Sequence, residues 1–207
     1  HRRDGFLLAG TCCLIGVTFG VFADSSGLGL SQASALSIFT FTGASQFALV
    51  SVVAGGGTSV AAVGGALLIG ARNGLYGPSV APLLQGGPVR RALSAQFVID
   101  ETAAMAAAQD DPVMAREAFW TTGLWLFAFW NIGTVLGVMA GSALDNPGAL
   151  GLDAAFPAAF VALLVPHLRT RPGQVTALLG GAIALVSVPV TIAGVPVLLA
   201  ALAVPVG

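Results

Sequence analysis

Residues 5–23 read GFLLAGTCCLIGVTFGVFA, and this stretch decides the fold class. It contains 19 residues without a charge. At a rise of about 1.5 Å per residue, a helix of that length crosses the hydrocarbon core of a bilayer, which is about 30 Å thick. The second half of the stretch, IGVTFGVFA at 15–23, recurs as IGTVLGVMA at 132–140 with five identities in nine positions. The chain therefore contains an apolar membrane helix, and a similar sequence to its second half recurs later in the chain.

The composition extends this interpretation to the whole chain of 207 residues. Charged residues make up 8% and hydrophobic residues 56%, whereas soluble domains carry about 25% charged residues. Further apolar segments follow the first one, at residues 31–53, 60–84, 119–143, 152–168, 175–192 and 195–206. We predict an all-α integral membrane protein, a polytopic helical bundle of about 7–8 hydrophobic segments that forms one transmembrane domain over residues 1–207.

Several classes of function are excluded by residues that the sequence lacks. All eight basic residues are Arg and the net charge is −1, so the sequence offers no basic patch for nucleic acid. Cys12 and Cys13 are adjacent inside an apolar stretch, a spacing that suits neither a metal site nor a disulfide framework. No hydrolase, zinc-protease or nucleotide-binding motif occurs. We therefore expect no enzyme activity and no cofactor.

The recurring element indicates an internal duplication. Two shorter matches follow in the same order: LGL at 28–30 and 150–152, and GGA at 64–66 and 180–182. We predict repeat halves at residues 5–85 and 119–206, joined by a polar-flanked helical segment at 86–118. Two related halves around a polar midplane are a recurring plan of secondary transporters, so the duplication favours transport over catalysis.

The relation between the repeats depends on residues 90–109, an apolar stretch that begins with Arg90 and Arg91. If this stretch crosses the membrane, the repeats begin four crossings apart and run parallel; if it does not, they begin three crossings apart and are inverted. The positive-inside tendency places the N-terminus in the cytoplasm in the first case and outside in the second. Both topologies stay open at the level of sequence.

The first candidate site lies at residues 41–47, which read FTGASQF. Small residues around Gly43 allow a helix to unwind, and the side chains of Thr42, Ser45 and Gln46 can hydrogen-bond a polar solute. Small residues with Ser and Thr are also normal at membrane helix interfaces, so ordinary packing is the alternative. Gln46 favours a site, because a buried primary amide needs several partners or water.

The second candidate site lies in the middle of residues 60–84, whose glycines and prolines predict a broken or kinked helix. On a helix Arg72 shares a face with Tyr76, and Asn73 also reaches Tyr76. An Arg at mid-membrane costs about 2.5 to 3.5 kcal/mol, so it should find a compensating partner. The alternatives are an ion pair with Asp100 or Glu101, recognition of a substrate carboxylate, and snorkelling to the membrane surface.

Asp100 and Glu101 form the third candidate site. Adjacent residues on a helix point about 100° apart, so the two carboxylates are expected to serve different partners. One can pair with Arg72, while the other can bind a substrate ammonium group or titrate as a proton-coupling group. If the segment lies at the membrane surface instead, both are solvated charges. Asp153, at the start of a later apolar segment, is expected to cap a helix.

Together these three elements resemble the signature of the AzlC family: FTGASQF at 41–47, Arg72 followed by LYG at 75–77, and the Asp100-Glu101 pair. The resemblance continues with GT at 133–134, Gly137 and LGLD at 150–153. It therefore extends in order over nearly the whole chain. Members of this family are the large subunits of branched-chain amino acid exporters.

The resemblance implies a multi-pass permease of the bacterial inner (cytoplasmic) membrane that exports valine, leucine, isoleucine and in some cases methionine. It also implies a small hydrophobic membrane partner of the AzlD type. We expect export to be driven by the proton gradient. The expected substrate-binding residues are Thr42, Gly43, Ser45, Gln46, Arg72, Asn73 and Tyr76, and the expected coupling or ion-pair residues are Asp100 and Glu101.

One departure from the family pattern lies beside Arg72. The family often has Asn-x-Arg-His there, whereas Gly70 and Asn73 occupy the Asn and His positions in this chain. The substrate or the energy source can therefore differ. Two other functions stay open: a non-transporting membrane subunit whose polar residues assemble a larger complex, and a passive channel for a small polar solute.

Overall fold

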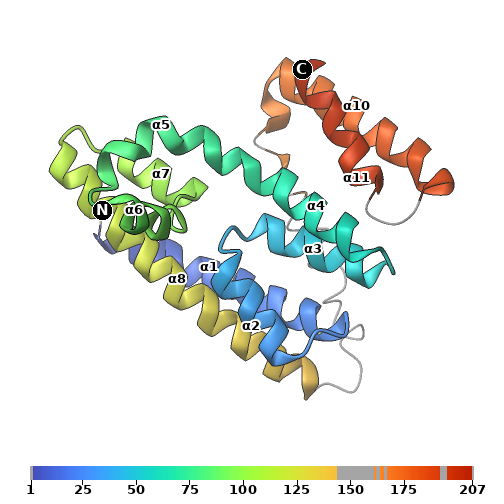
Figure 1. Ribbon diagram of the computed structural model, residues 1–207, viewed down its shortest axis with the longest axis horizontal. Helices are drawn as coiled ribbons and strands as arrows, with labels where there is room; N and C mark the ends of the chain where they lie inside the picture. The colour runs from blue at the N-terminus through green and yellow to red at the C-terminus, as the bar shows by residue number, and fades with distance from the viewer. Residues whose placement is uncertain (1, 144–160, 162–163, 166, 192–194, 207) are drawn as a thin grey trace.

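The computed structural model describes residues 2–143, 161, 164–165, 167–191 and 195–206, and within these ranges every regular element is helical (Figure 1). Three helices are long and apolar enough to cross a membrane: α1 (Arg2–Ser25), α8 (Pro112–Ser142) and α10 (Arg171–Ser187), the last continued by the 3₁₀ helix η5 (Val188–Val190). The expected count of seven or eight hydrophobic segments is not confirmed within these ranges. Asp153 lies outside the described residues.

The other elements are shorter. They are α2 (Leu30–Phe39), α3 (Ala44–Ala54), α4 (Ser59–Gly70), η1 (Ala71–Tyr76), α5 (Gly77–Val80), η2 (Ala81–Leu83), α6 (Pro88–Ala95), α7 (Asp100–Ala107), η4 (His167–Arg169), α11 (Val195–Ala200) and η6 (Ala201–Val206), where η marks 3₁₀ helices.

The two long helices α1 and α8 lie side by side and run in the same direction (Figure 1). At one end Arg2 forms an ion pair with Glu117. At the other end Ser142 donates from Oγ to Asp24 Oδ1 at 2.9 Å. Because the contacts follow the same order along both helices, α1 and α8 form a parallel pair. α2, α3 and α7 pack against this pair.

Four glycines allow the backbones of α1 and α8 to touch. A Cβ atom on Gly16 would lie 2.9 Å from the Trp130 carbonyl oxygen, and one on Gly20 would lie 2.8 Å from the Gly137 Cα. A Cβ on Gly133 or on Gly137 would likewise meet the backbone of α1. Small residues four apart are what lets two membrane helices approach this closely. These glycines occupy equivalent positions in the two copies of the repeated sequence, so the copies pack against each other.

The prediction of a single span over residues 31–53 is wrong, because the chain reverses inside it. α2 runs back from the C-terminal end of α1 along α8, where Ser37 Oγ lies 3.1 Å from Thr134 Oγ1. After the reversal α3 returns in the direction of α1, and Phe47 stacks on Phe22 at a centroid distance of 6.3 Å. α2 and α3 therefore form a helical hairpin that enters and leaves the bundle at the same end.

Residues 60–84 contain the break expected from their sequence. α4, η1, α5 and η2 follow one another from Ser59 to Leu83, with the 3₁₀ helix η1 interrupting the α-helix. Val80 packs in one cluster with Ala115 and Phe119 near the start of α8. This composite helix therefore runs opposite to α8 over most of its length.

Residues 90–109 form a second hairpin rather than one helix. α6 begins where η2 lies against α8. At the turn between α6 and α7, Gln96 donates from Nε2 to the Ile38 carbonyl at 2.7 Å. α7 then returns, so that Ala106 packs with Phe119 near the start of α8. The α6–α7 hairpin thus enters from the end opposite to the α2–α3 hairpin, and the two tips meet inside the bundle.

The order of helix and hairpin therefore occurs twice in residues 2–107, first as α1 with α2–α3 and then, in the reverse direction, as α4–α5 with α6–α7. α8 runs parallel to α1, as in the parallel topology. However, fewer crossings separate α1 from α8 than the parallel or the inverted topology assumed. The reason is that each hairpin returns to the end at which it entered and so does not cross. The proposed halves at 5–85 and 119–206 stay a prediction, since residues 144–160 lie outside the described ranges.

We expect Gly20→Ala to destabilise the protein by roughly 1–3 kcal/mol, because the new methyl group must push the α1 and α8 backbones apart. Gly10→Ala is the matched control on the same helix, since a Cβ there meets nothing within 4 Å. Thermal unfolding in detergent micelles measures both variants. Equal melting temperatures for the two would contradict the close helix contact.

The hairpins predict a labelling pattern for single cysteines placed in a variant that lacks Cys12 and Cys13. A membrane-impermeant maleimide should reach Ser25→Cys and Ser59→Cys from one side of the membrane. It should reach Gly87→Cys and Asp110→Cys from the other side. If residues 31–53 crossed as one helix, Ser25→Cys and Ser59→Cys would react from opposite sides.

Candidate functional site

The tip of the α2–α3 hairpin is shaped by Gly43, whose φ of +62° is a conformation that residues with side chains rarely adopt. Just before it, the Thr42 amide donates to the Thr40 carbonyl at 2.6 Å, and the Ala44 amide donates to the Thr42 carbonyl at 2.7 Å. A Cβ on Gly43 would lie 3.4 Å from the Trp130 ring. The backbone is therefore non-helical where the sequence predicted unwinding, and the first turn of α3 follows it directly.

Buried polar atoms without hydrogen-bond partners gather at this tip. Among the described residues they include Thr42 Oγ1, Ser45 Oγ and Gln46 Oε1. Gln46 is 0% exposed, and its Nε2 donates to the Leu36 carbonyl at 2.8 Å. Leaving a buried polar atom unpaired costs about 1–3 kcal/mol, so three at one turn indicate a place where a polar solute or water is bound.

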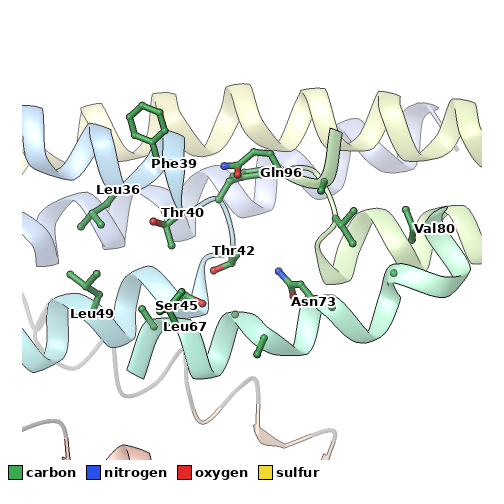
Figure 2. A pocket seen from close by; sticks show the side chains of 18 of the residues that line it. Leu36, Phe39, Thr40, Thr42, Ser45, Leu49, Leu67, Asn73, Val80 and Gln96 are labelled. Atoms are coloured by element: carbon green, nitrogen blue, oxygen red, sulfur yellow. The ribbon is translucent and has the colours of Figure 1, made fainter. Parts of the chain in front are cut away.

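A cavity of about 970 Å³ opens beside the tip. Its walls come from α2, α3, the composite helix α4–α5 and α6, and most of the lining side chains are apolar (Figure 2). In Figure 2 Leu36 and Leu49 lie on one side of Thr42, and Val80 lies on the other. The cavity is therefore a mainly apolar chamber with a polar region near its middle.

The polar region draws on all three broken elements. Thr42 and Ser45 come from the first hairpin, Asn73 from η1 and Gln96 from the tip of the second hairpin (Figure 2). Hydroxyl groups and primary amides both donate and accept hydrogen bonds. The chamber can thus bind a small molecule that has both an apolar part and polar groups of either kind.

Arg72 does not line this cavity, because it is engaged with Asp100. Its Nη2 lies 2.8 Å from Asp100 Oδ2, and the side chains are 39% and 36% exposed. The Tyr76 hydroxyl also interacts with Asp100. The first of the three alternatives raised for Arg72 is therefore the one seen, an ion pair that connects η1 to the start of α7.

A second, smaller cavity of about 40 Å³ lies between the two hairpin tips. Its lining residues are Cys12, Phe41, Thr42, Gly43, Ile99, Glu101, Leu126 and Trp130. Glu101 thus faces a different space from its neighbour Asp100, as the angle between adjacent helix residues predicts.

The residues expected at a substrate site are therefore distributed over several places. Thr42, Ser45 and Asn73 line the larger cavity, while Gly43 lines the smaller one and shapes the tip. The others lie beyond the larger cavity: Gln46 packed behind the tip, Arg72 and Tyr76 at the ion pair, and Asp100 and Glu101 on α7.

Sequence reasoning missed Gln96 and Trp130. Gln96 interrupts an apolar stretch as Gln46 does, and that same signal could have found it. Trp130 lies on a strongly apolar helix, where an aromatic residue carries no signal of its own. Its Nε1 is buried without a hydrogen-bond partner among the described residues, and only the tertiary structure reveals this.

With the site described, comparison with known proteins becomes informative. Residues 8–144 match the family model of the AzlC protein. The chain belongs to the AzlC family. The match runs from α1 through α8, so this AzlC-family region includes both hairpins and both cavities.

Several known proteins resemble the chain over most of their length. An uncharacterised membrane protein of Archaeoglobus fulgidus is 32% identical, with 83% of this chain and 75% of that protein covered. The inner membrane protein YgaZ of Escherichia coli K12 is 30% identical over 86% of this chain and 78% of its own length. An uncharacterised membrane protein of Helicobacter pylori 26695 is 25% identical, with 84% and 76% covered. No solved structure matches the chain.

The ion pair predicts a compensation that this AzlC-family protein should show. Arg72→Gln should lower the melting temperature in detergent micelles, because it leaves the Asp100 carboxylate without its cation. Arg72→Gln/Asp100→Asn should recover most of the loss. Arg2→Gln, which removes a pair at the exposed end of α1, is the control and should change stability by less than about 0.5 kcal/mol. A melting temperature of Arg72→Gln equal to that of the wild type would show that the pair contributes nothing to stability.

Proposed function

We propose that this protein is the permease of a branched-chain amino acid exporter and that the larger cavity holds the substrate. The observation that carries the proposal is the combination of about 970 Å³ of mainly apolar space with unpartnered polar atoms at one turn of its wall. Ligand pockets usually measure about 300–1,000 Å³ and combine apolar walls with a few placed polar groups. An amino acid with an aliphatic side chain has the matching chemistry.

The aliphatic side chain would lie against the apolar wall. Leu36 of α2, Leu49 of α3, and Val63 and Leu67 of α4 face the cavity from three helices. Burial of apolar groups contributes about 0.8 kcal/mol per CH₂ group. Valine, leucine, isoleucine and methionine therefore gain binding energy here that smaller or polar amino acids lack.

The substrate carboxylate would lie at the start of α3. A helix N-terminus presents free backbone N–H groups and a partial positive charge, and broken helices of transporters bind substrate carboxylates in this way. The hydroxyl groups of Thr42 and Ser45 can donate to the same carboxylate. These hydroxyls currently lack partners within the described part of the chain.

The substrate ammonium group would bind the amide oxygens of Asn73 and Gln96, which line the same cavity. Asn73 stands where the family often has His. The amide carries no charge at any physiological pH, so in this chain the position can contribute to binding without titrating. Arg72 would act indirectly, since its ion pair with Asp100 links η1 to α7.

We further propose that the proton gradient drives export and that a small hydrophobic subunit of the AzlD type assists it. The proposed location is the bacterial cytoplasmic membrane. The name of the Escherichia coli relative, inner membrane protein YgaZ, supports this location. The helical breaks support a transport cycle, because non-helical backbone at membrane depth is tolerated where it lines a cavity.

The test is efflux of labelled leucine from proteoliposomes that contain the chain, with and without its small partner, under an imposed proton gradient. The wild-type chain should give saturable, gradient-dependent efflux. Val63→Trp should lower it at least tenfold, because the indole fills the cavity. Val60→Trp is the matched control, since Val60 lies on the same helix, is 83% exposed and does not line the cavity.

The outcomes separate the competing functions. Leucine movement that neither saturates nor responds to the gradient would favour a passive channel. No movement in either preparation, with folded protein, would favour the non-transporting subunit. Equal efflux by Val63→Trp and Val60→Trp would remove the cavity as the substrate site.

A further inference from the structure

The smaller cavity, where the two hairpin tips meet, is a separate site. It is bounded by Phe41 and Gly43 on one tip, by Ile99 on the other, and by Leu126 and Trp130 of α8. Phe41, Ile99, Leu126 and Trp130 are all less than 9% exposed. The cavity therefore lies inside the bundle, on the boundary between two segments that enter from opposite ends.

Polar groups reach this cavity from three elements. Trp130 is 7% exposed, and its Nε1 has no hydrogen-bond partner among the described residues. Thr42 Oγ1 also has no hydrogen-bond partner among the described residues. Glu101 of α7 is the third polar residue that lines the cavity. An indole N–H can only donate and an ionised carboxylate can only accept, while a hydroxyl does both. A water molecule can satisfy all three, whereas a bare cation would be repelled by the indole N–H.

The volume agrees with this assignment. A water molecule needs about 10–15 Å³ of cavity volume, so a cavity of about 40 Å³ has room for about three or four waters. An amino acid is too large for it. The smaller cavity is thus distinct in its contents from the larger one, although Phe41 and Thr42 line both.

Only one of the two adjacent carboxylates forms an ion pair within the described residues. Asp100 is held in the ion pair with Arg72, whereas no basic side chain forms an ion pair with Glu101 in the described residues. The charged and titratable groups near Glu101 are Asp100 on its own helix, Arg72 on η1, Cys12 on α1 and, farther away, Tyr76. Arg72 is the single cation of this group, and Asp100 already neutralises it.

We propose that the smaller cavity holds water and that Glu101 is the residue that takes up and releases the coupling proton. In the uptake step, a cavity water accepts a proton from one side of the membrane and becomes hydronium. One O–H bond of this hydronium breaks as an O–H bond forms on the Glu101 carboxylate, which leaves a neutral water and a neutral Glu101. In the release step, that bond breaks and the proton returns to water connected to the other side. Trp130 and Thr42 position the water between them. This inference rests on the proposed function for the identity of the transported solute and for the proton gradient as the driving force.

The arrangement of the hairpins allows Glu101 to take up a proton from one side of the membrane and release it to the other. α2–α3 enters from one end of the bundle and α6–α7 from the other, and both tips bound the cavity. Movement of one hairpin connects the cavity with one side of the membrane, and movement of the other connects it with the opposite side. Thr42 lines both cavities, so it lies between Glu101 in the smaller cavity and the substrate in the larger one. A change in the charge of Glu101 is thus one residue away from the bound substrate.

The first experiment tests proton uptake without any solute. In the full-length Trp120→Phe/Trp125→Phe variant, Trp130 is the remaining tryptophan, since the chain has three. Its fluorescence in detergent micelles should change with pH as Glu101 gains and loses its proton. Glu101→Gln on this background should abolish the titration, and Glu117→Gln, at the exposed end of α8, should leave it unchanged. The same titration in the Glu101→Gln variant would overturn the proposal.

The second experiment separates coupling from binding in proteoliposomes. Glu101→Gln should keep leucine counterflow, which needs no proton, within about twofold of the wild type, and should lose gradient-driven efflux at least tenfold. Trp130→Phe should weaken gradient-driven efflux while keeping counterflow. Gradient-driven efflux at the wild-type rate in Glu101→Gln would overturn the proposal, as would equal loss of both activities in folded protein.

The two experiments distinguish this inference from the proposed function. If the wild type moves no leucine but Trp130 fluorescence titrates only when Glu101 is present, the exporter proposal fails and the proton site stands. If leucine efflux is gradient-driven but insensitive to Glu101→Gln, the exporter stands and the proton site fails.

Discussion

The close contact between α1 and α8 is the constraint on which the other elements depend. Four glycines bring the two backbones together over the middle of both helices, with Gly16 lying against the Trp130 carbonyl. The same turn of α8 carries Trp130 and Thr134, which contact the α2–α3 hairpin through Gly43 and Ser37. The hairpin tip is therefore positioned by the helix pair, and both cavities follow from its position.

Aromatic contacts hold the two hairpin tips together. Phe41 of the first tip and Phe97 of the second both pack on Phe127 of α8, at centroid distances of 5.1 and 5.6 Å. Each such pair contributes about 0.5–1.5 kcal/mol beyond the burial of area. These contributions offset part of the cost of the unpartnered polar atoms nearby. The site thus combines an apolar support, which fixes the tips, with polar groups that remain available to a ligand and to water.

The candidate site could be found from sequence where a residue type is costly in a membrane. The cost of Arg72 predicted a carboxylate partner, and Asp100 provides one at 2.8 Å. The small polar residues around Gly43 predicted an unwound turn, and the positive φ of that glycine shows it. Sequence could not show that Gln46 packs behind the tip or that Gln96 faces the cavity, because both glutamines are equally costly in apolar surroundings.

The number of membrane crossings could not be predicted from the sequence either, because different chain paths have the same hydropathy. The 23 residues at 31–53 are long enough to cross a bilayer once, and hydropathy is the same for a span and for two short helices that turn back. Gly43 and its neighbours permit a reversal, but a kink within one span would need the same residues. The direction of the chain after the break depends on contacts with α1 and α8, which are distant in sequence.

By itself the sequence determined the membrane class, the family resemblance, the two glycine-bearing helices and most of the polar positions, because each of these follows from local composition, spacing or motif. The tertiary structure alone decided which polar groups share a space. Asp100 and Glu101 are neighbours in the chain, yet one pairs with Arg72 and the other faces the small cavity. Helix geometry predicted that the two carboxylates face different surroundings, but only the packing of two hairpins from opposite ends decided which one pairs with Arg72 and which one faces the small cavity.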